Sequence, residues 1–254
     1  QLQELSGEEL VKYIHNLTSY KHKIWYSGPL TMSDFTTKMK SGHALPDEFL
    51  PTPELKDYEM LDREGNEVFF AHYDMVQAEI MWLKKSTEFN IDEGAQISMF
   101  NEYFGGGMSS IVFQEIREAK GLAYTAYCRF DTPDEPKKSH YFRGYIGTQP
   151  DKLNQALETA MGLLTEMPII DNQIEAARNS ILKQIASDRK IKDQKYFFYL
   201  SNLKRGINYD NRKDTYEYIK TAKQEDLVDF FESKIEGNTY TLMVMGNKED
   251  LDLE

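Results

Sequence analysis

Two side chains with hydrogen-bond donors, Arg117 and Tyr124, stand on either side of Gly121. The segment predicts a helix that ends near Lys120, a reversal at Gly121 and a strand from residue 122. A guanidinium and a phenol brought together by that reversal could both donate to a carbonyl oxygen, or to the oxyanion that it becomes. From the residues alone, a structural ion pair for the arginine and a half-buried packing role for the tyrosine stay open as the alternative.

A second candidate is the glycine run Gly105, Gly106 and Gly107, which interrupts two expected helical stretches. It is neither a G-x-G-x-x-G motif nor a phosphate loop, because no Lys follows at the required place. Three successive glycines permit a close approach of backbone, either from a neighbouring element or from a bound chain. A hinge and a binding role therefore both remain open for this run.

Metal and nucleophile chemistry are not expected from this chain. No histidine lies three or four positions from another, so no helix presents two imidazoles to one ion. The five are His15, His22, His43, His72 and His140. The single cysteine, Cys128, excludes an internal disulfide framework, and its place inside an expected strand predicts a small buried hydrophobe.

Composition narrows the class of protein. The 254 residues are 40% hydrophobic and 28% charged, which is typical of a folded domain and excludes intrinsic disorder. The formal net charge of −12 would repel phosphate backbones, so we expect no nucleic-acid partner. No run approaches the roughly 18 apolar residues of a membrane span, and no basic-then-apolar leader follows Gln1. We expect neither a membrane span nor a targeting segment in this fragment, and the compartment is left unknown.

The two ends of the chain carry a similar unit of helix, turn, strand and glycine. A capping box at Ser6 and Glu9 opens a helix to residue 17, and residues 23–26 then read as a strand before Gly28. Near the other end, a helix from residue 226 precedes a strand over 240–245 and a glycine. The repetition predicts that residues 1–45 are the tail of a preceding repeat and that this sequence is part of a longer protein. We expect the strand at 23–26 to join a sheet edge, of its own chain or of a neighbouring one, or else to be poorly ordered.

Residues 46–66 contain three prolines among acidic residues and predict an extended connector. Beyond it, the patterns predict strands at 68–71, 78–83, 122–130, 140–147 and 240–245, with helices at 92–104, 109–120, 150–164 and 171–185. Residues 67–254 are therefore expected to form an α+β repeat of two layers, with helices on one face of a mostly antiparallel sheet.

Three segments read together carry a resemblance to a known family. Residues 100–110 (FNEYFGGGMSS), 113–117 (FQEIR) and 121–124 (GLAY) resemble the pitrilysin/insulinase zinc peptidases. The similarity is to the non-catalytic repeat that faces the catalytic one, whose pattern is a glycine-rich helix break, an Arg, six residues and a Tyr after Gly and Leu. It is sharp over about residues 97–130 and rests on element order over about 67–246.

The resemblance implies specific roles. In the family, an H-x-x-E-H helix of an N-terminal repeat binds zinc, and the C-terminal half closes over it to form a chamber for peptides. Here residues 99–103 (MFNEY) match that helix, with Met99 and Tyr103 at the ligand positions and only Glu102 in agreement, so the zinc site is lost. Arg117 and Tyr124 match the residues that reach the substrate backbone and help to stabilise the tetrahedral intermediate, and the glycine run is assigned to substrate binding.

The leading hypothesis is the substrate-contacting C-terminal half of a zinc-dependent metalloendopeptidase, inert as this fragment. Its expected partners are an N-terminal catalytic repeat of the same protein, which would hold the zinc, and a peptide substrate. The first alternative is a non-catalytic scaffold or core subunit related to the same family, and the second is a repeat that works in trans with a separate zinc-bearing subunit. An H-x-x-E-H motif upstream would favour the peptidase.

Overall fold

The computed structural model describes residues 4–237 and 239–251. Its backbone contacts divide the chain into two compact units, Gln1–Glu59 and Met60–Glu254, and each is described by itself. The larger unit contains the sheet, the helical layer and all the residues for which chemistry was predicted.

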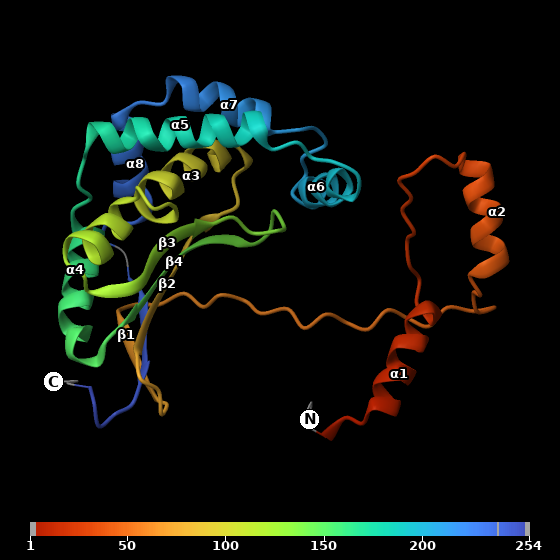
Figure 1. The fold of residues 1–254 in the computed structure, drawn as a ribbon, viewed down its shortest axis with the longest axis horizontal. Coiled ribbons are helices and arrows are strands. Elements are labelled where there is room, and N and C mark those ends of the chain that lie inside the picture. The colour runs from red at the N-terminus through yellow and green to blue at the C-terminus, as the bar shows by residue number, and fades with distance from the viewer. Residues whose placement is uncertain (1–3, 238, 252–254) are drawn as a thin grey trace. The chain divides into compact units, whose positions relative to one another are not determined.

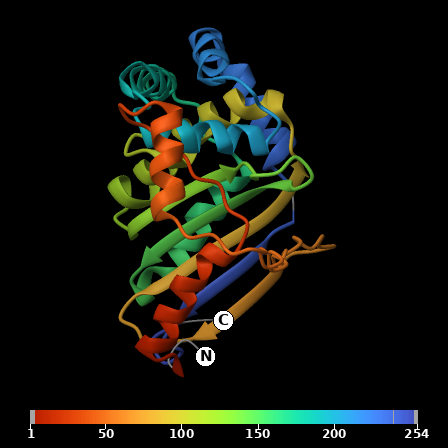
Figure 2. The ribbon, with the colours of Figure 1, turned by 90° about the vertical axis from the view of Figure 1, so that its right-hand side faces the viewer.

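The sheet of the larger unit has five strands in the described residues. They are β1 (Glu67–His72), β2 (Ala78–Glu88), β3 (Ala123–Asp131), β4 (Ser139–Thr148) and β5 (Thr241–Gly246), in the spatial order β1-β5-β2-β4-β3 (Figure 2). The β1–β5 pair is parallel and the other three pairs are antiparallel. The prediction of a mostly antiparallel sheet is confirmed, and β3 lies at one edge of it.

Helices pack on one face of this sheet (Figure 1). They are η3 (Ile91–Glu93), α3 (Gly94–Phe100), η4 (Asn101–Gly106), η5 (Phe113–Ala119), η6 (Pro150–Lys152), α4 (Leu153–Thr165), α5 (Asp171–Ser187), α6 (Asp193–Lys204), α7 (Arg212–Thr221) and α8 (Gln224–Lys234). Alternate residues of β2 explain the layering: Ala78, Ile80 and Trp82 are buried toward the helices, whereas Met81 on the opposite face is exposed.

Aromatic rings hold the two layers together at the β3 edge. Phe100 of α3 stacks on Phe104 of η4 at 5.2 Å between ring centroids and contacts Phe230 of α8 at 4.9 Å. Phe230 in turn meets Phe130 of β3 edge to face at 5.1 Å. Such ring pairs each contribute about 0.5–1.5 kcal/mol beyond the area they bury. The helix that carries the glycine run is therefore fixed against the edge strand.

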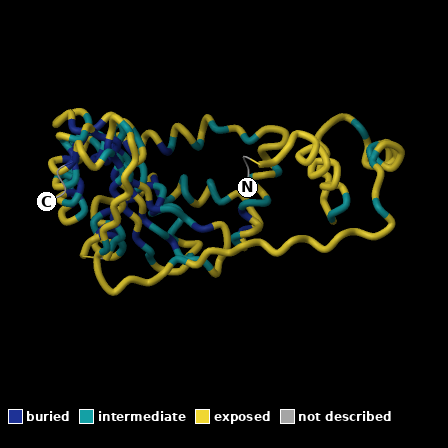
Figure 3. Tube along the Cα trace, turned by 90° about the horizontal axis from the view of Figure 1, so that it is seen from below, coloured by how far each residue is buried: buried dark blue, intermediate teal, exposed yellow. Residues whose placement is uncertain are grey.

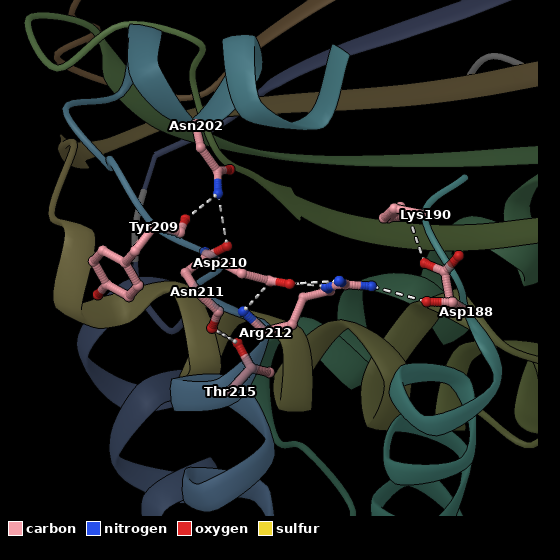
Figure 4. A network of polar contacts seen from close by, with 8 residues as sticks. All are labelled: Asp188, Lys190, Asn202, Tyr209, Asp210, Asn211, Arg212 and Thr215. Atoms are coloured by element: carbon pink, nitrogen blue, oxygen red, sulfur yellow. Dashed lines mark hydrogen bonds and ion pairs between the residues drawn. The ribbon is translucent and has the colours of Figure 1, made fainter. Parts of the chain in front are cut away.

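A polar network connects the segments between α5 and α6 and between α6 and α7 (Figure 4). Neither α6 nor α7 was predicted from the sequence. The Arg212 guanidinium donates to the Asp210 carboxylate and to the carbonyl of Asp188, at 2.8 Å in each case. The buried Asn202 amide donates to the carbonyl of Tyr209 at 3.1 Å and to the side chain of Asn211 at 3.0 Å. Hydrogen bonding with Arg212 lowers the pKa of Asp210. α6 and α7 are held in part by these hydrogen bonds, and not by the regular buried apolar stripe from which a helix is predicted.

The buried imidazole of His140 links β4 to the segment before α3. One ring nitrogen, Nδ1, lies 3.2 Å from the carbonyl of Asp131, and the other, Nε2, lies 3.3 Å from the amide nitrogen of Asn90. A neutral ring with its proton on Nδ1 satisfies both partners. Burial lowers the pKa of His140, although the Asp131 carbonyl and the carboxylate of Glu93 oppose that effect.

Acid should therefore weaken the fold through His140. At pH values below the ordinary histidine pKa of about 6.5, His140 is protonated in the unfolded chain but stays neutral in the folded chain, because its pKa there is lower. The free energy of unfolding therefore falls as the pH drops. Urea unfolding between pH 7.5 and 5.5 measures this slope. His140→Gln should flatten it, and the exposed His15→Gln should leave it unchanged. Equal slopes for all three proteins would contradict the assignment.

The smaller unit contains α1 (Gly7–Asn16), η2 (Leu17–Ser19) and α2 (Met32–Gly42). The predicted capping box is confirmed, since Ser6 accepts from the Glu9 amide and the Glu9 carboxylate accepts from Ser6. None of the described residues from 4 to 59 is buried (Figure 3).

The prediction of a strand at residues 23–26 is wrong for this structure. A strand needs hydrogen-bond partners along its length, and the ladder contact of this region is a single bridge between Tyr20 and Leu50. Tyr26 is engaged in a local turn instead, with its ring stacked on Phe35 at 4.5 Å and its hydroxyl accepting from the Leu30 amide at 2.8 Å. The division into a tail over 1–45, a connector over 46–66 and a repeat over 67–254 stays a prediction.

Candidate functional site

The glycine run packs one helix directly against the edge strand. Gly105 of η4 is buried, and a Cβ atom on it would lie 2.3 Å from the carbonyl oxygen of Cys128 on β3. Only a residue without a side chain permits this approach. Gly106 is exposed and Gly107 is partly exposed. The structure thus gives Gly105 a packing role, and substrate contacts by Gly105, Gly106 and Gly107 stay a prediction.

Asn101, on the first turn of η4, also attaches this helix to the strand. Its side-chain amide donates to the carbonyl of Phe130 at 2.9 Å, and its side-chain oxygen accepts from the Phe130 amide at 2.7 Å. Because β3 is an edge strand, Phe130 has both groups free of a neighbouring strand on that side. The two bonds substitute a side chain for the missing strand and align η4 along β3.

The positions that match the family's zinc ligands are used for packing. Met99 and Tyr103 are each 1% exposed. The Tyr103 hydroxyl donates to the carbonyl of Pro168 at 2.6 Å and accepts from the Ile170 amide at 3.0 Å, so its hydrogen-bonding capacity is occupied. Burial raises the pKa of this phenol. A thioether and a protonated, hydrogen-bonded phenol do not fit a zinc site.

The described residues contain no group of three or more His, Cys, Asp or Glu side chains placed to hold a metal ion. The structure does bring two histidines together that their spacing did not reveal. The Nε2 atoms of His22 and His43 lie 2.7 Å apart in the smaller unit. Within the same described ranges, no helix is both long and apolar enough to cross a membrane.

Arg117 lies near the end of η5, a π-helix, where the chain reverses at Gly121. Gly121 has φ +59° and donates its amide to the carbonyl of Arg117 at 3.1 Å, which is the left-handed helix termination that the sequence predicted. The turn is held from η6 and β4: Lys152 donates to the carbonyl of Gly121 at 3.1 Å, and the hydroxyl of Thr148 donates to the carbonyl of Leu122 at 2.5 Å.

Tyr124 reaches the surface because β3 begins with a β-bulge. Ala123 pairs with Thr148 of β4 and Thr125 pairs with the preceding residue, Gly147, so Tyr124 is the extra residue. Strict alternation would have put Tyr124 on the same face as Ala126, which is buried. Instead its side chain is 73% exposed. Bulges commonly redirect a side chain in this way beside functional sites.

The two predicted donors meet at this point. The guanidinium carbon of Arg117 lies 5.4 Å from the centroid of the Tyr124 ring and 4.8 Å from that of Phe113 on the preceding turn. Both distances are within the range of about 6 Å for cation–π contact. The ion pair with Glu118 is long, at 3.7 Å, and both side chains are more than a third exposed, so it holds the arginine weakly. The alternative of a half-buried tyrosine is wrong.

This geometry is that of a two-layer α+β repeat with a surface pair of donors at one sheet edge. A family model described as the peptidase M16 inactive domain matches residues 31–180, which is more than half of the chain. The chain belongs to the peptidase M16 inactive-domain family. This confirms the resemblance to the pitrilysin/insulinase peptidases and to their non-catalytic C-terminal repeat.

Among curated proteins, the chain is similar to an uncharacterized zinc protease of Bacillus subtilis, YmxG. The identity is 26% over 83 residues, which are 33% of this chain and 20% of that protein.

Solved structures share the fold. A conserved protein from Enterococcus faecalis has a TM-score of 0.73 and 16% identity, covering 99% of this chain and 58% of its own. A protease from Helicobacter pylori has a TM-score of 0.66 and 14% identity, covering 96% and 59%. A peptidase M16 inactive domain from Pseudomonas fluorescens has a TM-score of 0.63 and 16% identity, covering 86% and 52%. The chain spans just over half the length of these three structures.

The packing role of Gly105 leads to a stability prediction. Gly105→Ala forces a Cβ against the backbone of Cys128, which cannot rotate away, so we expect a loss of about 1–3 kcal/mol in the free energy of unfolding. Gly107→Ala is the matched control, because its nearest neighbour is the flexible carboxylate of Glu102 at 3.3 Å, and it should stay within about 0.5 kcal/mol. Urea unfolding measures both, and equal losses would contradict the close-packing account.

Proposed function

We propose that this chain is the substrate-contacting C-terminal half of a zinc-dependent endopeptidase. In this role Arg117 and Tyr124 donate hydrogen bonds to the backbone of a bound peptide. Membership of the inactive-domain family and the similarity to a zinc protease support the proposal. The single observation that carries it is the exposed Arg117–Tyr124 pair, formed by a left-handed helix end and a β-bulge.

The geometry suits stabilisation of an oxyanion. The guanidinium carbon of Arg117 lies 4.8 Å from the centre of the Phe113 ring and 5.4 Å from that of the Tyr124 ring, and the planar guanidinium carries five N–H donors. The phenol adds an O–H donor from an exposed side chain. As a peptide carbonyl becomes tetrahedral its oxygen gains negative charge, and charge-assisted hydrogen bonds to it strengthen. Both donors would then favour the transition state over the substrate.

The proposal assigns the zinc and the catalytic base to a separate N-terminal catalytic half. Within this chain, Met99 and Tyr103 stand where ligands would be needed and are committed to the core. The smaller unit supports the idea of a preceding repeat, because the apolar stripe of α1, including Leu10 and Ile14, is more than half exposed. Such a stripe is typical of a helix that packs on another element.

Kinetics of conservative variants test the proposal in the intact protein that joins this chain to a zinc-bearing half. Tyr124→Phe removes one hydroxyl, and Arg117→Lys removes the planar fork. Loss of one oxyanion donor costs about 10²–10³ in turnover, so kcat should fall by that order while the melting temperature changes little. Peptide cleavage at steady state and thermal unfolding are the two measurements.

Matched controls lie on the same strand. Tyr127→Phe removes a hydroxyl from a ring that stacks on Tyr145 at 5.5 Å, and Arg129→Lys alters an exposed arginine paired with Asp131. Neither should change kcat by more than about twofold, as expected of surface changes away from the reacting atoms. Turnover close to wild type in both Tyr124→Phe and Arg117→Lys would refute the proposal and favour a non-catalytic scaffold.

A further inference from the structure

The helix α6 presents apolar side chains to solvent instead of to the core of the domain. It lies beyond the end of α5 (Figure 1), and the hydrophobic core of the described residues includes none of its side chains. Its one buried residue is an asparagine, Asn202. Phe197, Tyr199 and Leu203 are 64%, 45% and 47% exposed. Because most helices in proteins gain their stability by packing an apolar face, these three side chains are left without the tertiary packing that is usual for them.

Polar bonds attach another side of α6 to the domain. The Asn202 amide donates to the carbonyl of Tyr209 at 3.1 Å, and the Arg205 guanidinium donates to the carbonyl of Pro133, in the connection between β3 and β4, at 2.8 Å. Phe198, four positions before Asn202, lies on the same side of the helix and is only partly exposed. The helix is thus held in place with apolar side chains outward, where another molecule can reach them.

The segment around α6 is basic in an acidic chain. Residues 189–205 contain six Lys and Arg side chains and a single acidic one, whereas the whole chain has a net charge of −12. Lys190 is paired with Asp188. Four other basic side chains of this segment are exposed and form no ion pair within the described part of the chain: Arg189, Lys192, Lys195 and Lys204. Positive charge that is not compensated locally, placed around exposed aromatic rings, attracts an anionic surface.

We propose that α6 binds the surface of a bilayer that contains anionic phospholipids. Its exposed apolar side chains would enter the boundary between headgroups and acyl chains, and the four basic side chains would face the phosphates. Tyrosine, which has an apolar ring and a polar hydroxyl, is typical of this boundary. The helix would lie on the membrane without crossing it, which agrees with the finding that no described helix is long and apolar enough to span one.

The kind of charge favours a lipid surface over an acidic protein. Three of the four exposed basic side chains are lysines. Lysine is depleted at protein–protein interfaces, whereas lysines beside aromatic and leucine side chains are typical of segments that lie on membranes. The negative charge of the rest of the chain permits this contact, because charges farther than about 8–10 Å from the membrane are largely screened at physiological ionic strength. None of these residues belongs to the Arg117–Tyr124 pair, so the inference stands apart from the proposed peptidase function.

Co-sedimentation of the 254-residue chain with lipid vesicles tests the inference. We expect saturable binding to phosphatidylcholine vesicles that contain about 30% phosphatidylglycerol, and binding at least about tenfold weaker to pure phosphatidylcholine. Raising the salt concentration from about 0.05 M to about 0.5 M should weaken the binding at least about tenfold, because it shortens the Debye length. Equal binding to both kinds of vesicle, or no binding to either, would overturn the inference.

Matched variants separate α6 from the rest of the surface. Lys195→Gln and Lys204→Gln should each lower the vesicle partition coefficient about fivefold. Phe197→Ser should lower it about tenfold. The controls are Lys248→Gln, which removes an exposed lysine after β5, and Met243→Ser, which removes a side chain of β5 that is 47% exposed. β5 ends beside the start of β2, whereas the β3–β4 connection that holds α6 adjoins the end of β2, so both controls should stay within about twofold of wild type.

Circular dichroism confirms that each variant is folded, and two further results would overturn the inference. Unchanged vesicle binding by folded Phe197→Ser and Lys195→Gln would place the contact elsewhere on the chain. Self-association of the chain without vesicles, measured by light scattering and lost in Phe197→Ser, would assign the apolar surface of α6 to a second copy of the chain.

Discussion

The contact between Gly105 and the backbone of Cys128 is the constraint on which the rest of the domain depends. It lets η4 lie directly on the edge strand, closer than any side chain would allow. Asn101 then satisfies the Phe130 amide and carbonyl, and the stack of Phe100 and Phe104 closes the core above them. The next helix, η5, follows after a short break in the chain, so its C-terminal end lies beside the start of β3.

The position of the donor pair follows from that arrangement. The left-handed turn at Gly121 reverses the chain two residues after the end of η5, and the bulge at Tyr124 then turns outward a side chain that alternation would have buried. One continuous stretch thus serves two purposes. Its first half is committed to packing through Met99 and Tyr103, and its second half presents Arg117 and Tyr124 to the outside. A helix committed to the core and an exposed pair of donors are thus compatible in a single repeat.

Much of this fold could be predicted from the sequence, and what was missed has physical causes. Short apolar runs located the five strands of the sheet, and Gly121 located the helix end. The bulge was not foreseen because its signature is hydrogen-bond register, not residue type. α7 was missed because Ile219 is its one buried residue, and α6 is held by the polar bonds of Asn202. The prediction of a strand at 23–26 was wrong because a strand requires a hydrogen-bonding partner strand, which composition does not reveal.

Affinity for a transition-state mimic tests the central claim most directly. A series of phosphinic peptides places a charged tetrahedral group where the proposed oxyanion would form, and their inhibition constants can be compared across variants of Arg117 and Tyr124 in the intact protein that joins this chain to a zinc-bearing half. If the pair acts on the transition state, each variant should weaken inhibition by the same factor by which it lowers kcat/KM, while KM for the substrate stays nearly constant. Inhibition constants that remain at the wild-type value while kcat/KM falls would contradict the account.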